Sequence, residues 1–333
     1  MKYQDEVITT SNKRKRDHSL PELLSVSPSP HIRKLDTVRS IMLDVIIALM
    51  PALIWGYFRF GVRVIWIVGL SVTTAVVCEV AYQIFAKKTL RITDLSCVVT
   101  GLILGLMLPV KVSLWVPCIG SAFAILVVKQ FFGGIGKNIV NPAIAARVFL
   151  MLCWPQELIK LTNGKTDVIS CATPLVSLKN GQTPDSQYFD LVIGNCAGAI
   201  GEVSAIAIAI GFLYLLFRGV ISLHIPVAFV GTIALVSVLS PITGQTNATV
   251  FQLLSGSLLF AAAFSVNDPT TTPVTNTGKI IFGIGCGLVT VFIRYFGAYP
   301  DGTAFAILLM NLLVPLFESW TMPKRFGGKY EKE

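Results

Sequence analysis

Residues 101–109 read GLILGLMLP, and residues 256–264 read GSLLFAAAF. Both segments are apolar, begin with glycine and stand in corresponding places in the two halves of the chain. A second pair, residues 131–133 (FFG) and 295–297 (YFG), is separated by 164 residues, whereas the first pair is separated by 155. The second half therefore carries about nine extra residues, which fall around residues 267–273 (NDPTTTP). We interpret the two halves as an internal repeat.

The composition of the 333-residue chain indicates an integral membrane protein. Hydrophobic residues make up 53% of the sequence, charged residues 14%, and the mean hydropathy is +0.71. These values exclude an ordinary soluble protein of this size. The net charge of +9 does not indicate a nucleic-acid partner, because the basic residues fall in short loops and tails beside apolar segments. The composition instead predicts a lipid bilayer as the partner.

The cysteines do not indicate a metal site. The seven cysteines form no C-x-x-C pair, and most lie inside apolar segments, where they behave as small apolar residues. We expect neither a metal site nor a disulfide framework. A signal peptide is not expected either, because the first apolar run begins only near Ile41 and further runs follow it.

The hydrophobic pattern predicts ten transmembrane spans. Five precede a long polar interval at residues 155–190, and five follow it. The third, fifth and eighth spans are short for a bilayer crossing, so we expect some of them to be tilted, half-length or re-entrant. The ten spans are residues 41–58, 62–86, 95–109, 113–132, 141–154, 195–217, 219–240, 250–265, 279–298 and 302–320.

The number of spans in each half predicts how the two halves insert. Because five is odd, the second half must enter the membrane upside down relative to the first, which is the inverted-repeat plan of many transporter folds. Paired short spans mark the central site in such folds, so we expect the site between spans 3 and 8. The predicted regions are a basic cytoplasmic tail (1–40), a first transmembrane half (41–154), an extracytoplasmic loop (155–190), a second transmembrane half (191–320) and a cytoplasmic tail (321–333).

The distribution of lysine and arginine predicts the orientation of the chain. If the spans alternate from a cytoplasmic N-terminus, nineteen basic residues fall inside and seven outside, with Arg147 within a span. Basic residues concentrate on the cytoplasmic side of membrane proteins. Both termini are therefore predicted to be cytoplasmic, and the polar interval is predicted to face the extracytoplasmic side.

The polar interval contains a threonine suited to carry a modification. Residues 167–175 read DVISCATPL. Pro174 keeps Thr173 in an extended conformation, which holds out its hydroxyl, and the small Ala172 leaves room for a bulky group. A hydroxyl in this position has the chemistry to accept a phosphate ester.

The same stretch resembles the flavin-attachment signature D-x-x-S/T-G-A-T, in which the last threonine carries FMN through a phosphoester bond. Asp167, Ser170, Ala172 and Thr173 match the signature. Cys171 replaces the usual glycine, which makes the backbone turn less permissive. An ordinary Ser/Thr turn in a surface loop is the alternative interpretation.

Four ionisable residues lie within or near the predicted spans: Asp44, Glu79, Glu202 and Arg294. An unpaired charge in the bilayer costs on the order of several kcal/mol, so each is expected to be paired or functional. Asp44 and Glu202 stand early in the first span of each half, which suggests symmetry-related roles in a cation path. Two structural carboxylates hydrogen-bonded to neighbouring helices are the alternative.

Other polar and glycine-rich motifs have simpler explanations beside the functional ones. Asn138, Asn141 and residues 267–273 place polar groups at membrane depth or at its edge, where irregular chain must be buried or line a cavity; helix capping is the alternative. Residues 133–137 (GGIGK) lack the spacing of a phosphate-binding loop. Residues 283–287 (GIGCG) lie inside a span and are better explained by close helix packing. No nicotinamide site is visible.

Several stretches together resemble one family. From about residue 28 to 320 the chain is similar to the D subunit of the Rnf ion-translocating electron-transport complex, and more distantly to the B subunit of the sodium-translocating NADH:quinone reductase. The stretches that carry the resemblance are residues 29–31 (SPH), 41–51 (IMLDVIIALMP), 136–143 (GKNIVNPA), 167–173 (DVISCAT) and 267–273 (NDPTTTP).

The resemblance implies a membrane component of an ion-translocating ferredoxin:NAD oxidoreductase in the bacterial cytoplasmic (inner) membrane. FMN on Thr173, installed by a flavin transferase, is expected to relay electrons between neighbouring subunits, coupled to Na+ or H+ movement. The chain has no complete active site of its own. The resemblance also implies the inverted-repeat fold of urea transporters and, in some relatives, a second non-covalent flavin, riboflavin. Further candidate cofactor-binding residues are Asp167, Ser170, Asn138, Asn141 and Asp268.

A second hypothesis belongs to a different class of protein. The same inverted-repeat plan suits a stand-alone solute channel or secondary transporter in which Thr173 is unmodified. Covalent flavin separates the two hypotheses, because only the electron carrier requires it.

The predicted topology is testable by labelling a single introduced cysteine. We expect Lys165→Cys in a cysteine-depleted background to react in intact cells with an impermeant thiol reagent, because the charge distribution puts this loop outside. Protection in intact cells, with labelling only after lysis, would contradict the topology and with it flavin attachment outside the cytoplasm.

Overall fold

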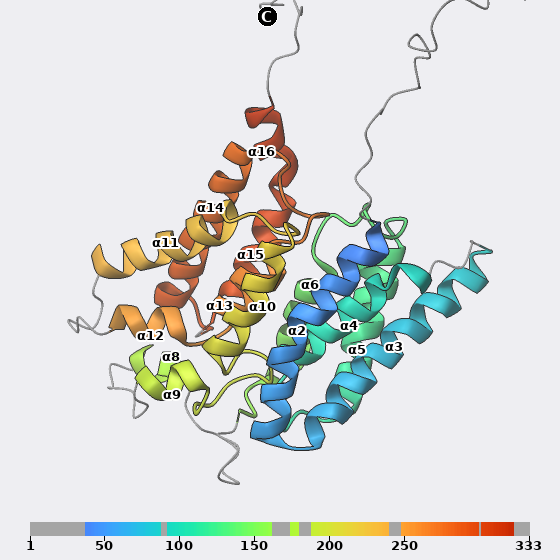
Figure 1. Cartoon of the computed structure of the whole chain (residues 1–333), viewed down its shortest axis with the longest axis horizontal. Helices are drawn as coiled ribbons and strands as arrows, with labels where there is room; N and C mark the ends of the chain where they lie inside the picture. The colour runs from blue at the N-terminus through green and yellow to red at the C-terminus, as the bar shows by residue number, and fades with distance from the viewer. Residues whose placement is uncertain are drawn as a thin grey trace, which may run out of the picture. The chain divides into compact units, whose positions relative to one another are not determined.

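The computed structural model describes residues 37–87, 92–161, 174–179, 188–239, 248–299 and 301–322. The chain divides into two units, Met1–Thr37 and Val38–Glu333, and every helix described below belongs to the second unit. All regular elements of the described residues are helices (Figure 1). The prediction of an all-α protein is therefore confirmed.

The first described elements of the chain are two long apolar helices, and α6, the helix of the fifth predicted span, is followed by α7, a single turn at the start of the polar interval. α5 continues without a break into a π-helical segment, η3, and a short 3-10 turn, η2, precedes α4. In chain order the elements are α2 (Val38–Phe60), α3 (Arg63–Phe85), η2 (Ile92–Asp94), α4 (Ser96–Leu106), α5 (Trp115–Phe123), η3 (Ala124–Gln130), α6 (Pro142–Cys153) and α7 (Pro155–Leu158).

The remaining elements start within the polar interval. α8 lies in that interval after α7, α9 begins near its end, and a second π-helical segment, η4, follows α13. The elements are α8 (Pro174–Lys179), α9 (Tyr188–Ile193), α10 (Ala205–Phe217), α11 (His224–Leu239), α12 (Ala248–Leu254), α13 (Leu258–Phe260), η4 (Ala261–Ser265), α14 (Asn276–Phe296), α15 (Thr303–Leu312) and α16 (Val314–Thr321).

The lengths and the apolar composition of these helices indicate a multi-pass membrane protein that also contains many short helices. Among the described residues, three helices are long and apolar enough to cross a bilayer: α2, α3 and α14. α15 and α16 reach that length only together and are bent by 54° at their junction. Shorter apolar helices are α4, α5 with η3, α6, α10 and α11.

One predicted span boundary is wrong, and one predicted short span is interrupted. The sixth span was expected from residue 195, but α10 begins at Ala205, where the Ser204 hydroxyl accepts a hydrogen bond from the Ala207 amide at 3.3 Å. The preceding chain is irregular, and its Gly201 amide instead donates to the Leu106 carbonyl at the end of α4 (2.7 Å). The eighth span is interrupted at Gly256, whose φ of +76° suits glycine and ends α12.

The two segments used to detect the repeat do not occupy matching helical positions. Gly101 lies in the middle of α4, whereas Gly256 lies in the turn before α13. Gly101 is required for a different reason, because a Cβ there would lie 2.8 Å from the Val72 Cα of α3. The sequence similarity of the two segments therefore does not mean that Gly101 and Gly256 occupy equivalent structural positions.

Pairs of glycines four residues apart bring helices into close contact. Gly101 and Gly105 let α4 approach the backbone of α3, and the Ser71 hydroxyl donates to the Gly101 carbonyl at 2.7 Å. Gly283 and Gly287 do the same for α14 against α11. The interpretation of residues 283–287 as a packing motif is confirmed.

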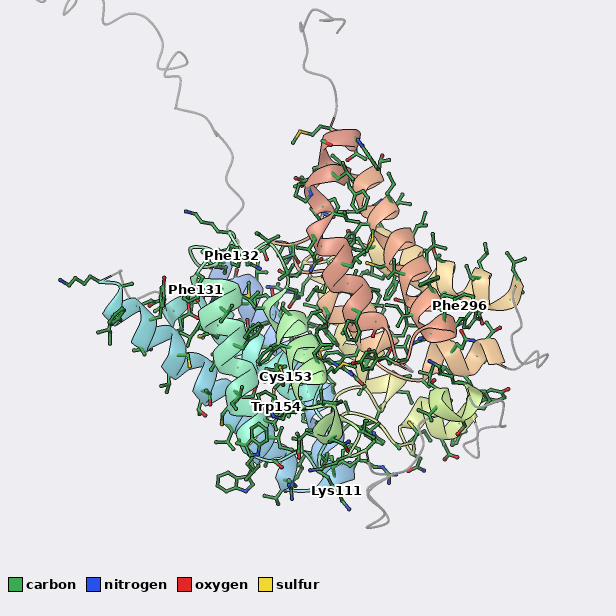
Figure 2. The ribbon with its side chains drawn as sticks, turned by 180° about the vertical axis from the view of Figure 1, so that it is seen from behind. Lys111, Phe131, Phe132, Cys153, Trp154 and Phe296 are labelled. Carbon is green, nitrogen blue, oxygen red and sulfur yellow. The ribbon has the colours of Figure 1, made fainter. Side chains whose placement is uncertain are left out.

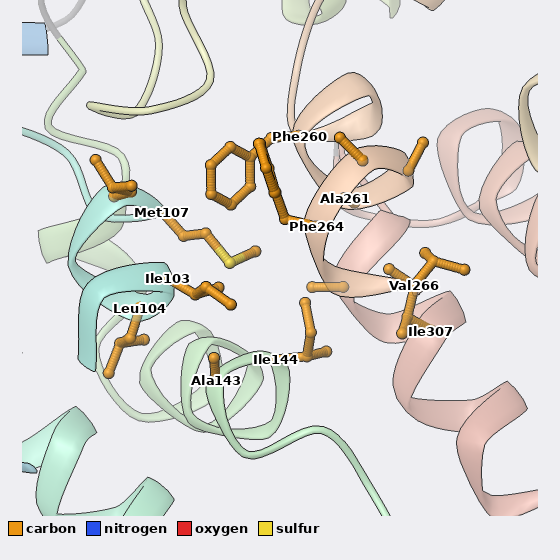
Figure 3. Close-up of a cluster of buried hydrophobic side chains, with 14 of the residues drawn as sticks. Ile103, Leu104, Met107, Ala143, Ile144, Phe260, Ala261, Phe264, Val266 and Ile307 are labelled. Carbon is orange, nitrogen blue, oxygen red and sulfur yellow. The ribbon is translucent and has the colours of Figure 1, made fainter. Parts of the chain in front are cut away.

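The central apolar core joins helices from both halves of the chain. Figure 3 shows Ile103 and Met107 of the α4 region facing Phe260 and Phe264 of α13 and η4, with Ile144 of α6 below them. All five side chains are buried. This cluster separates the two ends of α4, and these ends carry the polar features described below.

Aromatic residues gather at one end of the α5–η3 and α6 pair. Figure 2 shows Trp154 and Lys111 at the end opposite to Phe131 and Phe132. Trp154 makes an edge contact with Trp115, with ring centroids 5.2 Å apart. Trp enrichment of this kind is typical of a membrane–water interface.

The contact between α2 and α10 supplies a stability test. A Cβ at Gly211 of α10 would lie 2.0 Å from the Ala48 carbonyl oxygen of α2, so Gly211→Ala must push the two helices apart. We expect a loss of about 1–3 kcal/mol, measured as a lower unfolding midpoint of the purified protein in detergent. Gly231→Ala in α11 is the matched control, because nothing lies within 4 Å of its Cβ. Equal midpoints for the two variants would contradict the close α2–α10 contact.

Candidate functional site

A cavity of about 440 Å³ lies beyond the C-terminal end of α4 and is called the Arg cavity here. Its lining is mainly apolar and comes from both halves of the chain. The lining residues are Met107, Pro109, Arg147, Met151, Pro155, Leu158, Ile159, Leu161, Leu175, Val176, residues 196–199, Glu202, Val203, residues 254–256, Ala298, Tyr299 and Asp301.

The charged groups of the Arg cavity form pairs. Arg147 of α6 donates through Nη1 to Glu202 and forms an ion pair with it. Arg294 of α14 pairs with Asp301 at 3.5 Å, and its side chain is 2% exposed. Arg147, Glu202 and Asp301 line the cavity, Arg294 pairs with Asp301 from behind this lining, and the formal charges of the two pairs cancel.

Asp301 also holds the starts of two helices. Its carboxylate accepts from the Ser257 amide at 3.1 Å, before α13, and from the Thr303 amide at 3.4 Å, at the start of α15. The Thr303 hydroxyl donates to it at 3.1 Å. The first amides of a helix lack partners within the helix, so this single side chain satisfies donors of both α13 and α15.

α8 is seated directly on the Arg cavity. Leu175 is buried and lines the cavity, and a Cβ at Gly256 would come within 2.7 Å of its Cδ1. Lys179, at the end of α8, donates to the Gly297 and Tyr299 carbonyls of the α14–α15 loop. Figure 1 shows α8 beside α12, which it contacts. The segment that follows Thr173 is thus packed against the cavity wall.

Three predicted site residues lie outside the described residues. These are Asp167, Ser170 and Thr173. Thr173 is nevertheless bonded to Pro174, the first residue of α8.

α7 forms another part of the same wall, and its Glu157 ties it to the α4–α5 connection. The Glu157 carboxylate accepts from Lys160 and from the Ser113 amide, the latter at 2.9 Å. The hydrogen bond from Lys160 is the main cause that holds the pKa of Glu157 below its usual value. Glu157 therefore stays ionised at neutral pH.

A second, smaller cavity of about 90 Å³ lies at the opposite, N-terminal end of α4 and is called the Asn cavity here. Asn138, Asn141 and Asp268 all line it, so the structure brings these three predicted site residues together. α4 and η4 contribute to this cavity, whereas the Arg cavity is lined by Met107 and Pro109, which follow α4, and by residues 254–256, which precede α13. Both cavities thus lie where spans 3 and 8 meet, the region predicted to hold the site.

Hydrogen bonds within the protein already engage the Asn-cavity side chains. The Asn141 side-chain oxygen accepts from the Ala143 amide at 3.0 Å and caps α6, and its Nδ2 donates to the Ser265 carbonyl at 3.2 Å. Asp268 accepts from the Thr270 amide and hydroxyl. The two alternative interpretations of these residues, helix capping and cavity lining, therefore both apply.

Lys129 also lines the Asn cavity and belongs to a buried ion pair, of which the sequence analysis singled out only the other member, Glu79. Lys129 of η3 lies 2.7 Å from Glu79 of α3, and both side chains are at most 3% exposed. Lys129 also donates to Ser96 at 2.6 Å, and Gln130 donates to Glu79 at 3.1 Å. The charge count treats Lys129 as a cytoplasmic loop residue. Its position within the apolar run of residues 124–132 is the signal for a buried charge.

Asp44 and Glu202, the predicted ion-path residues, are both paired. Asp44 accepts from Tyr214 at 2.8 Å and from the Arg218 guanidinium at 3.1 Å. It therefore lies beside the C-terminal end of α10, whereas Glu202 lies in the turn before α10 begins. The two carboxylates thus stand near opposite ends of one helix. Ion pairing fits the structural alternative, and the role in a cation path stays a prediction.

The fold and the polar helix ends show which class of protein this chain belongs to. It is a multi-pass helical membrane protein with buried ion pairs beside two internal cavities. The model of the NQR2, RnfD, RnfE family matches residues 25–327, and the chain belongs to this family. The resemblance found in the sequence motifs is therefore confirmed.

The similar curated proteins cover nearly the whole chain. It is 42% identical to the D subunit of the Na(+)-translocating ferredoxin:NAD(+) oxidoreductase complex of Acetobacterium woodii, over 93% of this chain and 98% of that protein. It is 36% identical to the proton-translocating counterpart of Clostridium ljungdahlii, over 92% and 97%. The D subunit of the ion-translocating oxidoreductase complex of Stutzerimonas stutzeri is 34% identical, over 87% and 92%.

The buried Lys129–Glu79 pair is testable by removing one or both charges. Glu79→Gln leaves the Lys129 ammonium buried without a carboxylate, and we expect a loss of about 3–5 kcal/mol in stability. The double variant Glu79→Gln/Lys129→Met removes both charges and should recover most of this loss. Unfolding midpoints in detergent report the effect, and Lys137→Met at an exposed site is the control. A double variant less stable than Glu79→Gln would contradict the pairing.

Proposed function

We propose that this chain is the D subunit of an Rnf-type complex and carries FMN on Thr173 by a phosphoester bond. It relays electrons between neighbouring redox subunits, coupled to transport of Na+ or H+. The relatives are named as D subunits of complexes that translocate either ion, which supports this assignment. The observation that carries the flavin proposal is the Arg cavity, because its wall includes α8, whose first residue is bonded to Thr173.

The residues of the Arg cavity suit a flavin ring. Its volume of about 440 Å³ lies within the range of small-molecule sites, about 300–1,000 Å³. The wall is mostly apolar, which suits a flat aromatic ring, and Arg147 supplies hydrogen-bond donors for carbonyl and ring-nitrogen acceptors. A Cβ at Gly198 would meet only Val203, at 3.6 Å, so this part of the wall leaves space.

The protein and the cofactor have separate tasks in this proposal. A bound flavin supplies one-electron chemistry that no side chain provides. The chain's own residues position it: α8 holds the attachment segment against the wall, and Asp301 and Glu202 fix the charged groups around the cavity. The side chains of Ile103, Phe260 and Phe264 are buried in the apolar core and add no polar group between the two cavities.

The number of membrane spans and their orientation belong to the same proposal. Ten spans in two inverted halves with both termini cytoplasmic would place α8 on the extracytoplasmic side, where a flavin transferase acts. Lys129 and Arg294 are buried in ion pairs, so they do not act as loop charges, but removing both from the count leaves its direction unchanged. The excess of basic residues inside still supports this orientation.

Two further assignments belong to the proposal. The Asn cavity gathers Asn138, Asn141 and Asp268, but its volume of about 90 Å³ is below the range of small-molecule sites, so a second flavin there requires the wall to move. Asp44 and Glu202 are the proposed ion-path residues. A solute channel without flavin remains the competing function.

The attachment residue is tested by mass. We expect Thr173→Ala to lose all covalent FMN, because the ester oxygen is removed, while the protein still inserts and folds. Ser170→Ala should keep at least part of the FMN, because it changes the surroundings of the ester and not its oxygen. The measurement is the mass of the peptide that contains both residues, from protein produced together with its flavin transferase.

In-gel fluorescence of the denatured wild-type chain is an independent readout of covalent flavin. An FMN-sized increment that persists in Thr173→Ala would show that another residue is the acceptor. A wild-type peptide without the increment would contradict the flavin proposal and favour the solute channel.

A further inference from the structure

Arg147 is an unusual residue for its position. It lies in the middle of α6, a 12-residue apolar helix, and it is the one basic residue among the described residues that line the Arg cavity. Its side chain is 12% exposed, and it lies on the cavity wall. A cation inside a membrane protein is costly, so its presence indicates a function beyond packing.

The neighbours of Arg147 hold its guanidinium in place. Glu202 accepts a hydrogen bond from Nη1 and is 6% exposed. Asp301 lines the same cavity and pairs with Arg294. Asp301 is itself fixed by the amides of Ser257 and Thr303. The guanidinium therefore has a defined position against the cavity.

The charged side chains around the cavity balance one another. Arg147 offsets Glu202, and Arg294 offsets Asp301. A guanidinium has five N–H donors, and the bond to Glu202 engages the Nη1 group, which leaves donors for a second acceptor. An added negative charge in the cavity would thus meet a fixed cation with donor capacity remaining.

We propose that Arg147, held by Glu202, compensates the negative charge of the reduced flavin ring and so sets its reduction potential. The proposal rests on the attachment of FMN at Thr173. A flavin ring bound in the Arg cavity would gain one negative charge with each electron taken from a one-electron donor without an accompanying proton. A fixed cation stabilises that charge more than the neutral oxidised ring, because a mostly apolar wall screens the interaction less than bulk water does. Arg147 is a positioning and electrostatic residue, and it undergoes no chemical change.

The two members of the ion pair must act in opposite directions. Arg147→Met removes the cation and leaves Glu202 uncompensated, so the ring becomes harder to reduce and its potential falls. Glu202→Gln removes the anion and leaves Arg147 uncompensated, so the potential rises. The double variant restores the balance and should lie near the wild type. A role in packing alone would not produce shifts of opposite sign.

The experiment is a redox titration of the flavin absorbance in the purified, flavinylated protein. We expect each single variant to change the ratio of reduced to oxidised flavin at a fixed ambient potential by at least about tenfold, which corresponds to about 1.4 kcal/mol. Arg147→Lys keeps the charge and should shift less than Arg147→Met. If Arg147→Met does not yield folded protein, Glu202→Gln and the double variant still decide the sign.

The matched control is the other arginine–carboxylate pair, Arg218 with Asp44. It lies near the far end of α10, about 20 Å along the helix from Ala205, so Arg218→Met should leave the potential unchanged. Unchanged potentials in the Arg147 and Glu202 variants, or shifts of one sign in both, would overturn the inference. The peptide mass of each preparation separates this from a failure of the proposed function, which would appear as absence of FMN from the wild type.

Discussion

The structure depends on one constraint: helix ends that lie in apolar surroundings must find hydrogen-bond partners. α4, α6, α13 and α15 are too short to reach from one side of a bilayer to the other, so their terminal amides and carbonyls lie where water is scarce. Side chains must satisfy them. Asp94 accepts from the Ser96 amide at the start of α4, Asn141 caps α6, and Asp301 serves α13 and α15.

These capping groups also create the polar parts of the two cavities. Asn267 donates to the Ala262 and Ala263 carbonyls near the end of η4 and lines the Asn cavity, as Asn141 does. At the other end of the same short segments, Asp301 and Glu202 line the Arg cavity. Part of the polar lining of the two cavities is thus a consequence of the half-length helices. The long helices α3 and α14 add Glu79 and Arg294, which pair with Lys129 and Asp301.

The sequence predicts some of these features well, for identifiable reasons. Composition and apolar periodicity indicate an all-helical membrane protein, and the Asn-Pro motif at residues 141–142 indicates a helix start, because both depend on local chemistry. The start of α10 and the end of α12 escape such prediction, since they depend on Gly201 bonding to Leu106 and on the backbone angle of Gly256. Such long-range contacts and single torsion angles leave no periodic pattern.

The candidate site shows the same division. Asn138, Asn141 and Asp268 are predicted from motifs, and they do meet around one cavity. The residues that sequence reasoning does not assign to a site, Arg147 and Asp301, act through partners distant in the chain. Arg147 stands out in the sequence only as a basic residue inside a span, because its significance depends on Glu202, fifty-five positions away.

The shared carboxylate of Asp301 has a mechanical consequence. The Asp301 side chain accepts hydrogen bonds from the first turns of α13 and α15 and also forms an ion pair with Arg294 of α14. These three helices are therefore joined at a single point. None of them moves away from the others without giving up bonds that the remaining two use. Thermal motion of this corner of the molecule is therefore shared, and displacement of one helix is felt by all three.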